Sequence, residues 1–350
     1  MKASIIIPAY NAEGFIEGAL RSVTQTPPPF DYEILVVDDG STDGTGALLE
    51  RLSGELPSLR ILRRENAGPA AARNTALREA RGDYILFCDS DDTFTPHAVE
   101  QAVTLCEEKS ADLLIFGFNV VQKGESIPYH HKAAELFSKE ALGEALASLY
   151  RANMLNQVWG KVFSRRLISE NHLQFPQELW GEDRLFFFSI LEKAERVAVS
   201  PLCLYNYVQQ EGSLISRFLP EKPQVCRKIH LRILALAESL GKIEPQSEEV
   251  YSYMYLKSLL SAFSTLFSPS CSLSFREKRQ YVKEALLQKE LGEIRRLPRD
   301  AGLSFKILSK ILFTRSATLN LAAAWGIHSL SRLSPALFRK AKHAYNKKEK

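Results

Sequence analysis

Three carboxylates occur within four residues at the end of one short segment. Residues 84–92 read Y-I-L-F-C-D-S-D-D, in which a largely apolar run ends on Asp89, Asp91 and Asp92. The run has the pattern of a buried strand. Carboxylates this close to one another repel, and each loses hydration near a core. The segment therefore predicts either a site for a cation or a solvated acidic turn.

The elements around this segment alternate between two periodicities. Short apolar runs, typical of strands, alternate with segments of helical spacing over the first 120 residues. We expect strands at 4–7, 33–37, 59–62, 84–88 and 112–119, and helices at 13–23, from Thr42 or Asp43 to 52, at 70–80 with Gly82 as its stop, and from Thr95-Pro96 onward. Continuously apolar strands separated by helices indicate an α/β fold, with a doubly wound, mostly parallel sheet covered on both faces.

Polar residues follow several of these strands. The strand ends lead into P-A-Y-N at 8–11, D-D-G-S at 38–41, N-A-G at 66–68 and D-S-D-D at 89–92. In open parallel sheets ligands bind beyond the carboxyl ends of the strands, so these segments should share one rim. No G-x-G-x-x-G follows the first strand and no G-x-x-x-x-G-K-[ST] occurs. The sequence therefore argues against a dinucleotide site and a P-loop.

The rest of the chain divides into a mixed part and a helical part. We expect a hairpin at 124–131, helices at 139–151 and 183–193, and short strands at 197–199 and 204–208. Beyond Pro220 we expect helices at 222–242, 247–267, 274–292, 303–313, 316–331 and 335–346. The sequence thus predicts an α/β domain over 1–218 and a helical C-terminal domain over 219–350.

Composition restricts the class of protein. The chain is 45% hydrophobic and 25% charged, as in soluble globular proteins, and its net charge of +4 does not indicate a nucleic-acid partner. The five cysteines are scattered without a disulfide or metal spacing, which favours a reducing compartment. No signal peptide and no apolar run of about 18 residues is recognisable. We expect a cytoplasmic protein that either stays in solution or binds peripherally to the cytoplasmic face of the membrane.

The last part of the chain is basic. From Gly302 to Lys350 there are ten Lys or Arg residues and one acidic residue, Glu349, with Leu, Ile, Phe and Trp at helical spacing between them. Such helices bind anionic membrane surfaces, or they pack on the preceding domain with a solvated basic face. Residues 303–350 are therefore a candidate membrane contact.

Six sequence blocks follow one another along the first part of the chain. They are P-A-Y-N at 8–11, V-D-D-G-S-T-D-G-T at 37–45, E-N-A-G-P-A-A-A-R-N at 65–74, F-C-D-S-D-D at 87–92, W-G-K-V-F at 159–163 with G-E-D-R-L-F-F at 181–187, and Y-N-Y-V-Q-Q-E-G-S at 205–213. In this order the blocks resemble the inverting family 2 glycosyltransferases of the GT-A fold, particularly bacterial members that build cell-surface polysaccharides. The resemblance covers about residues 1–215.

The resemblance implies a nucleotide-sugar site at the rim of the sheet. Asp39 would accept a hydrogen bond from the base, which favours a UDP-linked donor, and Tyr10 would be part of the base-contacting wall or a packed aromatic at the rim. Arg73 would either meet the diphosphate or form a structural ion pair that orients the acidic cluster. The residues expected to contact the nucleotide sugar are Pro8, Ala9, Tyr10, Asp39, Gly68, Arg73, Asp89 and Ser90.

The resemblance also makes D-S-D-D the metal-binding element. Mn²⁺ and Mg²⁺ prefer oxygen ligands, usually one or two carboxylates together with substrate phosphates. Asp91 is the expected direct ligand. Asp89 lies on the same face of an extended segment and would bind the ribose or assist at the metal. Asp92 would hold the loop or share the metal.

The proton-accepting base is assigned through the resemblance to Asp183, at the start of a helix. Glu182 is its rival and is otherwise expected at the acceptor. Trp180 would stack on an acceptor sugar or be a core tryptophan, and Lys161, Gly212 and Ser213 are weaker candidates for phosphate contacts.

The sequence as a whole predicts a metal-dependent, inverting glycosyltransferase that uses a UDP-sugar and a saccharide or lipid-linked saccharide acceptor. A nucleotidyltransferase acting on sugar phosphates is the second enzyme class, but it would normally carry a glycine-rich loop near the first strand. A non-catalytic nucleotide-sugar-binding protein is the third possibility, and it would have no use for a base at Asp183.

Overall fold

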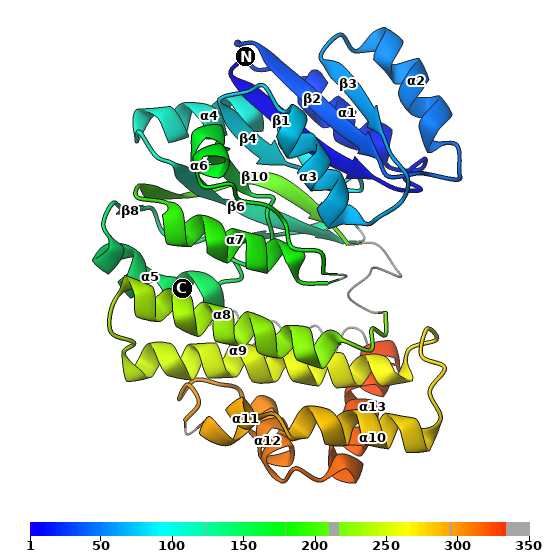
Figure 1. The fold of residues 1–350 in the computed structure, drawn as a ribbon, viewed down its shortest axis with the longest axis vertical. Helices are drawn as coiled ribbons and strands as arrows, with labels where there is room; N and C mark the ends of the chain where they lie inside the picture. Colours follow the sequence, from blue (N-terminus) through cyan, green and yellow to red (C-terminus); the bar gives the residue numbers. More distant parts are fainter. Residues whose placement is uncertain (123, 179, 210–216, 295, 334–350) are drawn as a thin grey trace. The chain divides into compact units, whose positions relative to one another are not determined.

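The computed structural model describes residues 1–122, 124–178, 180–209, 217–294 and 296–333 (Figure 1). The chain forms two compact units. The first comprises Met1–Gln210 with Ala235–Lys242, and the second comprises Glu211–Leu234 with Ile243–Lys350. The expected helix at 335–346 and the Gly212-Ser213 pair lie outside the described residues.

The first unit is built on one mixed sheet, in which the described residues contribute ten strands. Their order is β3-β2-β1-β4-β9-β6-β10-β5, with β7 beside β6 and β8 beside β10. The bounds are β1 (Ala3–Ala9), β2 (Tyr32–Asp38), β3 (Leu59–Arg63), β4 (Tyr84–Phe87), β5 (Thr93–Phe94), β6 (Leu113–Gln122), β7 (Glu125–Tyr129), β8 (Ala134–Leu136), β9 (Lys161–Ser164) and β10 (Val197–Val208).

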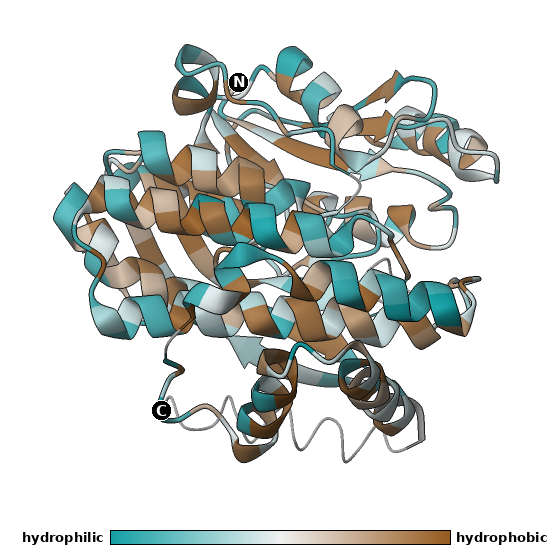
Figure 2. Cartoon of the chain, turned by 60° about the horizontal axis from the view of Figure 1, so that its bottom comes forward, coloured by the Kyte–Doolittle hydropathy of each residue, from teal (hydrophilic) through white to brown (hydrophobic). Residues whose placement is uncertain are grey.

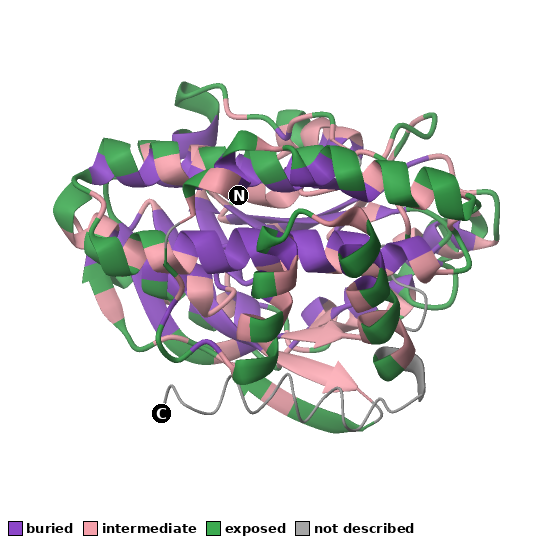
Figure 3. Ribbon diagram, turned by 90° about the horizontal axis from the view of Figure 1, so that it is seen from below, coloured by how far each residue is buried: buried purple, intermediate pink, exposed green. Residues whose placement is uncertain are grey.

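The longer ladders of this sheet are parallel. β2 pairs with β1 and β3, β4 pairs with β1, and β10 pairs with β6, all in parallel, whereas β9 inserts antiparallel between β4 and β6. The central strands are hydrophobic in Figure 2 and buried in Figure 3, as expected for strands covered on both faces. The expected α/β fold with a mostly parallel sheet and a C-terminal helical region is confirmed.

The helices of the first unit pack on this sheet, with α3, α6 and α7 in front of the strands in the view of Figure 1. An aromatic cluster joins β4 and β9 to α7: the Phe87 ring lies 5.7 Å from Phe163, and Phe175 stacks on Phe186 at 3.9 Å. The bounds are α1 (Ile16–Thr24), α2 (Thr45–Glu55), α3 (Pro69–Glu79), α4 (Ala98–Glu108), α5 (Lys139–Arg151), α6 (Arg165–Glu170) and α7 (Glu182–Lys193).

Two helix-start predictions are wrong in detail. α2 begins at Thr45 after Gly44, and Asp43 instead accepts hydrogen bonds from the Thr45 amide and hydroxyl. α4 does not open at Thr95-Pro96. It begins at Ala98, because His97 adopts a left-handed conformation with φ of 59° and the residues before it turn through β5.

Gly82 does not end α3, whose C-cap is Ala80. It lies instead against β1, where an added Cβ would approach the carbonyl carbon of Ala3 to 2.4 Å. This position needs glycine because two backbones meet there.

The two short strands expected around Pro201 form one strand, β10. Its pairing with β6 shifts register between Ser200 and Cys203 and again between Cys203 and Tyr205. Pro201 and Leu202 lie exposed at this irregularity, where a ladder tolerates a residue without an amide hydrogen.

The second unit is helical in its described residues. It contains most of α8 (Lys222–Leu240), α9 (Pro245–Ser264), α10 (Phe275–Leu286), α11 (Lys289–Glu293), α12 (Leu303–Phe313) and α13 (Ala317–Leu333), with a 3₁₀ turn, η2 (Thr265–Phe267), after α9. Ser274 starts α10 with a capping box that includes Glu277. Among the described helices we find none with the length and apolar character needed to cross a bilayer.

Candidate active site

A buried arginine joins three carboxylates from distant parts of the sequence. Arg73 lies on α3, and its Nη1 donates to Asp183 Oδ1 at 2.8 Å and to Glu182 Oε1 at 3.1 Å. Its Nη2 donates to Asp89 Oδ1 at 2.9 Å. One guanidinium thereby fixes the end of β4 against the start of α7. The structure thus shows Arg73 in ion pairs, and its contact with a diphosphate stays a prediction.

Asp183 occupies the first turn of α7, directly after Gly181 and Glu182. Its side chain is 19% exposed, and burial raises the pKa of this carboxyl to about 8, although the Arg73 charge opposes the rise. A base works best when its pKa lies near the pH at which it acts. Asp183 therefore has both the restricted solvent access and the proton affinity that suit a general base.

A second cation is buried near Asp183. Lys161, the first residue of β9, is 1% exposed. Its Nζ donates to the Trp159 carbonyl at 3.1 Å and lies 4.6 Å from the centre of the Phe187 ring. Burial lowers the pKa of this ammonium to about 7, and Asp183 opposes that change. The structure thus places Lys161 in the interior, where its charge acts on Asp183 through a medium of low polarity.

The D-S-D-D segment is held by β10. The Tyr205 hydroxyl accepts a hydrogen bond from the Asp89 amide at 3.0 Å and donates to Asp92 Oδ2 at 2.8 Å. Asp92 Oδ1 accepts from the Val208 amide at 2.7 Å. Burial raises the pKa of Asp92 to about 9, with the Asp89 charge adding to the effect. Both oxygens of Asp92 are engaged, so Asp92 supports the loop in this structure.

The Tyr205 ring is itself held by stacking. Trp159 stacks on Tyr205 with ring centres 4.7 Å apart and on Tyr207 at 5.5 Å. Trp159 and both tyrosines lie in blocks that carry the family resemblance, but the sequence predicts no role for either tyrosine. The Y-N-Y alternation was the available signal, because residues two apart in a strand face the same side.

Asp91 has no side-chain partner of this kind. Within the described residues, no hydrogen bond from another residue and no ion pair engages its carboxylate. Burial and the charge of Asp89 raise the pKa of Asp91. A second carboxylate so close to Asp91 also favours a cation at this position, since an opposite charge stabilises both ionised groups.

The carboxylates of Asp91 and Asp89 are the donors that this rim offers to a divalent metal. The described residues contain no cluster of three or more His, Cys, Asp or Glu side chains that would form a complete metal site. Asp91, together with the Asp89 oxygen that Arg73 leaves open, supplies one or two carboxylates. Mg²⁺ and Mn²⁺ usually take that number from a protein when substrate phosphates complete the coordination. The residues therefore fit such an ion.

Asp39 lies at the end of β2, and its carboxylate already has partners. It accepts from the Gly68 amide at 2.7 Å and the Ala67 amide at 3.2 Å, and Arg64 Nε lies 3.0 Å from Oδ1. Gly68 makes this contact with φ of 87°, a conformation that favours glycine. A carboxylate has about four acceptor sites, so Asp39 retains capacity for one further donor.

The first loop places an aromatic side chain in solvent. β1 ends at Ala9, which is paired with Asp38, and Tyr10 beyond it is 51% exposed. Asn11 fixes the loop. Its side-chain Oδ1 accepts from the Thr42 backbone amide at 2.8 Å, and its backbone amide donates to Ser41 Oγ at 3.0 Å. The loops after β1 and β2 are therefore joined, with Tyr10 projecting beside them.

Residues 4–170 match the family described as Glycosyl transferase family 2. Residues 4–170, just under half of the chain, therefore belong to glycosyltransferase family 2. The uncharacterized glycosyltransferase EpsJ of Bacillus subtilis (strain 168) is 30% identical over 223 residues, 63% of this chain and 64% of that protein. The poly(ribitol-phosphate) beta-N-acetylglucosaminyltransferase TarS of Staphylococcus aureus (strain Mu50) is 32% identical over 221 residues, 62% of this chain. That match spans only 37% of TarS.

Solved structures show the same fold. S. aureus TarS 1-349 in complex with UDP-GlcNAc superposes with a TM-score of 0.64 at 24% identity, covering 95% of this chain and 92% of that one. A mannosyltransferase from Pyrobaculum calidifontis in complex with GDP-Man and Mn²⁺ gives a TM-score of 0.53 at 19% identity, covering 95% and 88%. The expected family and the GT-A-like fold are thereby confirmed.

The residues expected at the acceptor lie beside this family 2 site. Glu182 is 8% exposed and shares Arg73 with Asp183, so it lies beside Asp183 in the Arg73 network. Trp180 is half-buried, and the Arg184 guanidinium lies 5.4 Å from its ring centre.

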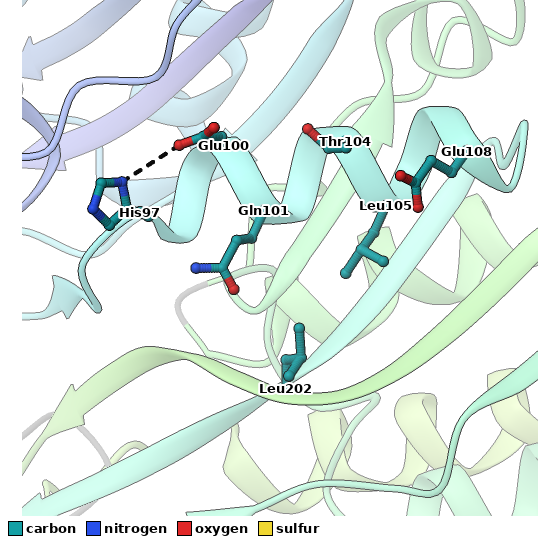
Figure 4. Close-up of a pocket in the computed structure, with 7 residues that line it drawn as sticks. All are labelled: His97, Glu100, Gln101, Thr104, Leu105, Glu108 and Leu202. Carbon is teal, nitrogen blue, oxygen red and sulfur yellow. Dashed lines mark ion pairs between the residues drawn. The ribbon is translucent and has the colours of Figure 1, made fainter.

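One depression elsewhere on the first unit, of about 430 Å³, is lined by α4 and Leu202 with none of the expected site residues (Figure 4).

Proposed function

We propose that this family 2 glycosyltransferase transfers a sugar from a nucleotide-sugar donor to a hydroxyl of a saccharide acceptor, with inversion at the anomeric carbon. The observation that carries the proposal is the Arg73 network, because it brings Asp89 of the donor side together with Asp183. A carboxylate with raised proton affinity at this position favours a transferase that needs a base over a non-catalytic binder.

Asp183 acts as the base in this proposal. It accepts the proton of the acceptor hydroxyl as the oxygen attacks the anomeric carbon, and the bond from that carbon to the diphosphate oxygen breaks. The nucleoside diphosphate leaves with the electron pair of that bond. Arg73 positions Asp183 through the contact at 2.8 Å and keeps it near Asp89.

The donor site lies at the carboxyl ends of β1, β2 and β4. Asp39, with its remaining acceptor capacity, would receive the base N–H, and Pro8, Ala9 and Tyr10 would form the wall beside the base. Gly68, Ser90 and Asp89 complete the donor side. Uracil has a ring N–H that suits an acceptor such as Asp39, and TarS was solved with UDP-GlcNAc, so we favour a UDP-sugar.

Asp91 and Asp89 would hold Mn²⁺ or Mg²⁺. The presence of two neighbouring carboxylates and the Mn²⁺ complex of the Pyrobaculum enzyme support this assignment. A bound divalent ion supplies Lewis-acid stabilisation of the negative charge on the leaving diphosphate. On the acceptor side, Trp180 and Glu182 would contact a saccharide. TarS acts on poly(ribitol-phosphate), and we favour a cell-surface glycan or its lipid-linked precursor here.

The test is a panel of nucleotide sugars with and without Mn²⁺. A donor should raise the melting temperature in the presence of Mn²⁺, since a ligand stabilises the state that binds it. UDP release with that donor and an acceptor saccharide should follow, and Asp91→Ala should remove the Mn²⁺-dependent part of both signals. Binding of UDP-sugars without transfer to any saccharide would support the binder instead, and exchange of pyrophosphate with a sugar phosphate would support the nucleotidyltransferase.

A further inference from the structure

The exposed face of α13 is mainly apolar, with Thr318 as an exposed polar residue and Ser329 half-buried on the same side. Leu319, Trp325 and Leu330 are 51%, 59% and 45% exposed, and Ala322 and Gly326 share their side of the helix. These residues recur at intervals of three and four, which places them along one stripe. The opposite side, with Asn320, Leu321 and Ala324, is buried. A surface helix normally shows the reverse arrangement, with charged residues on its outer face.

The preceding helix carries the same combination of exposed apolar and basic residues. Leu303 and Ile307 on α12 are 75% and 52% exposed, and Lys310 is exposed beside them. Figure 2 shows hydrophobic residues along these last described helices, and Figure 3 shows exposed residues on them. A cluster of exposed large apolar side chains on two successive helices indicates an interaction surface.

The charge of this region selects the partner. Residues 302–333 contain four basic residues, Lys306, Lys310, Arg315 and Arg332, and no acidic residue. A surface that binds a protein partner usually carries both basic and acidic residues. An anionic membrane offers acyl chains for the apolar stripe and headgroups for the basic residues, and tryptophan is enriched at that interface.

We propose that the stripe of Leu319, Trp325 and Leu330 on α13 inserts into the interface of an anionic lipid membrane, with Lys310 contacting its headgroups. The membrane contact expected of residues 303–350 is thereby narrowed to the exposed apolar face of α13, together with Lys310 of α12. The proposal does not depend on the proposed reaction, because lipid binding is measured without donor or acceptor.

The experiment is co-sedimentation of the full chain with vesicles of phosphatidylcholine alone or mixed with phosphatidylglycerol. We expect binding to the anionic vesicles that weakens at high salt, and little binding to the neutral ones. Leu319→Asp combined with Trp325→Asp should weaken binding by about tenfold or more, because two apolar side chains lose their burial in lipid. Phe275→Asp is the matched control, since Phe275 on α10 is 66% exposed and lies outside the stripe.

A second measurement needs no disruptive substitution. Brominated lipids should quench the fluorescence of the unaltered chain, and Trp325→Phe should remove that quenching while binding persists. Equal vesicle binding by the double Asp variant and the wild type would overturn the proposal. So would a concentration-dependent dimer that the double Asp variant abolishes in a chain that does not bind vesicles, because the stripe would then serve a second copy.

Discussion

Arg73 Nη1 lies 2.8 Å from Asp183 Oδ1, a contact between residues 110 positions apart in the sequence. The same guanidinium also holds Asp89, so its position determines the distance between the donor side and the base. An arginine suits this role because its planar fork presents several donors in a fixed arrangement and stays protonated. The Arg73 network is therefore the part of the site on which several predictions depend.

Arg73→Met should reduce transfer and move its pH profile toward alkaline pH. The Arg73 charge favours ionised Asp183, so its removal should raise the pKa of Asp183 further above about 8. The measurement is kcat/KM against pH for the wild type and the variant, together with thermal unfolding to confirm the fold. Arg73→Lys keeps the charge and should retain the profile while losing activity. An unchanged apparent pKa in Arg73→Met would contradict the electrostatic role.

Asp183→Asn should abolish proton acceptance while leaving the donor site intact. Transfer should fall by about 10²–10⁴, the usual contribution of a positioned base, with donor affinity by calorimetry near normal. For the wild type, kcat/KM should rise with pH toward about 8 because the ionised carboxylate is the active form.

Glu182→Gln is the matched control for the base, since Glu182 shares the Arg73 contact and the same helical turn. It should retain most of the transfer activity. If Glu182→Gln lost transfer and Asp183→Asn kept it, the roles of the two acids would be reversed.

Tyr205→Phe should weaken the response to metal rather than the affinity for the acceptor. The hydroxyl joins the Asp89 amide to Asp92, and its loss frees the loop that carries Asp91. We expect the Mn²⁺ concentration for half-maximal activity to rise by about tenfold, which corresponds to about 1.4 kcal/mol. Tyr207→Phe is the control, because Tyr207 also stacks on Trp159 and no hydrogen bond to its hydroxyl is seen among the described residues. Equal effects of the two substitutions would indicate a general packing defect.

The sequence predicts the strands and the rim of the site well because both depend on local patterns. Apolar runs that end on polar residues located β1, β2 and β4 to within about two residues, and D-S-D-D lies where the run at 84–88 placed it. Local patterns cannot give long-range pairing. The partners of Asp92 lie 113 and 116 residues away, and the Arg73 partners Glu182 and Asp183 lie 109 and 110 residues away, so only the fold brings them together.

The errors have physical causes of the same kind. β9 was not expected as a strand, because a four-residue segment inserted antiparallel between two longer strands has little pattern of its own. Gly82 was interpreted as a helix stop, whereas the close approach of β1 determines it. The helix expected to begin at Pro96 begins at Ala98, because His97 adopts a left-handed conformation that the sequence does not predict.

The stability of the second unit should decrease in mild acid through His230. This histidine on α8 is 5% exposed, stacks on Tyr255 at 4.5 Å, and its Nδ1 has no hydrogen-bond partner among the described residues. Burial lowers the pKa of His230 to about 4, below its value in the unfolded chain. The unfolded state therefore binds the proton more readily, so the free energy of unfolding is highest above about pH 6.5 and falls as the pH drops toward 4. The loss should reach about 3 kcal/mol.

His230→Phe keeps the stacking on Tyr255 and removes the titrating group, so its free energy of unfolding should depend less on pH between 7 and 4. Urea unfolding at a series of pH values measures this, and the difference between the two chains isolates the histidine from the other titrating groups. His97→Asn is the control, because His97 is exposed and asparagine accepts its left-handed conformation. A pH dependence identical in His230→Phe and the wild type would mean that His230 is protonated within the folded protein, with Glu290 compensating its charge.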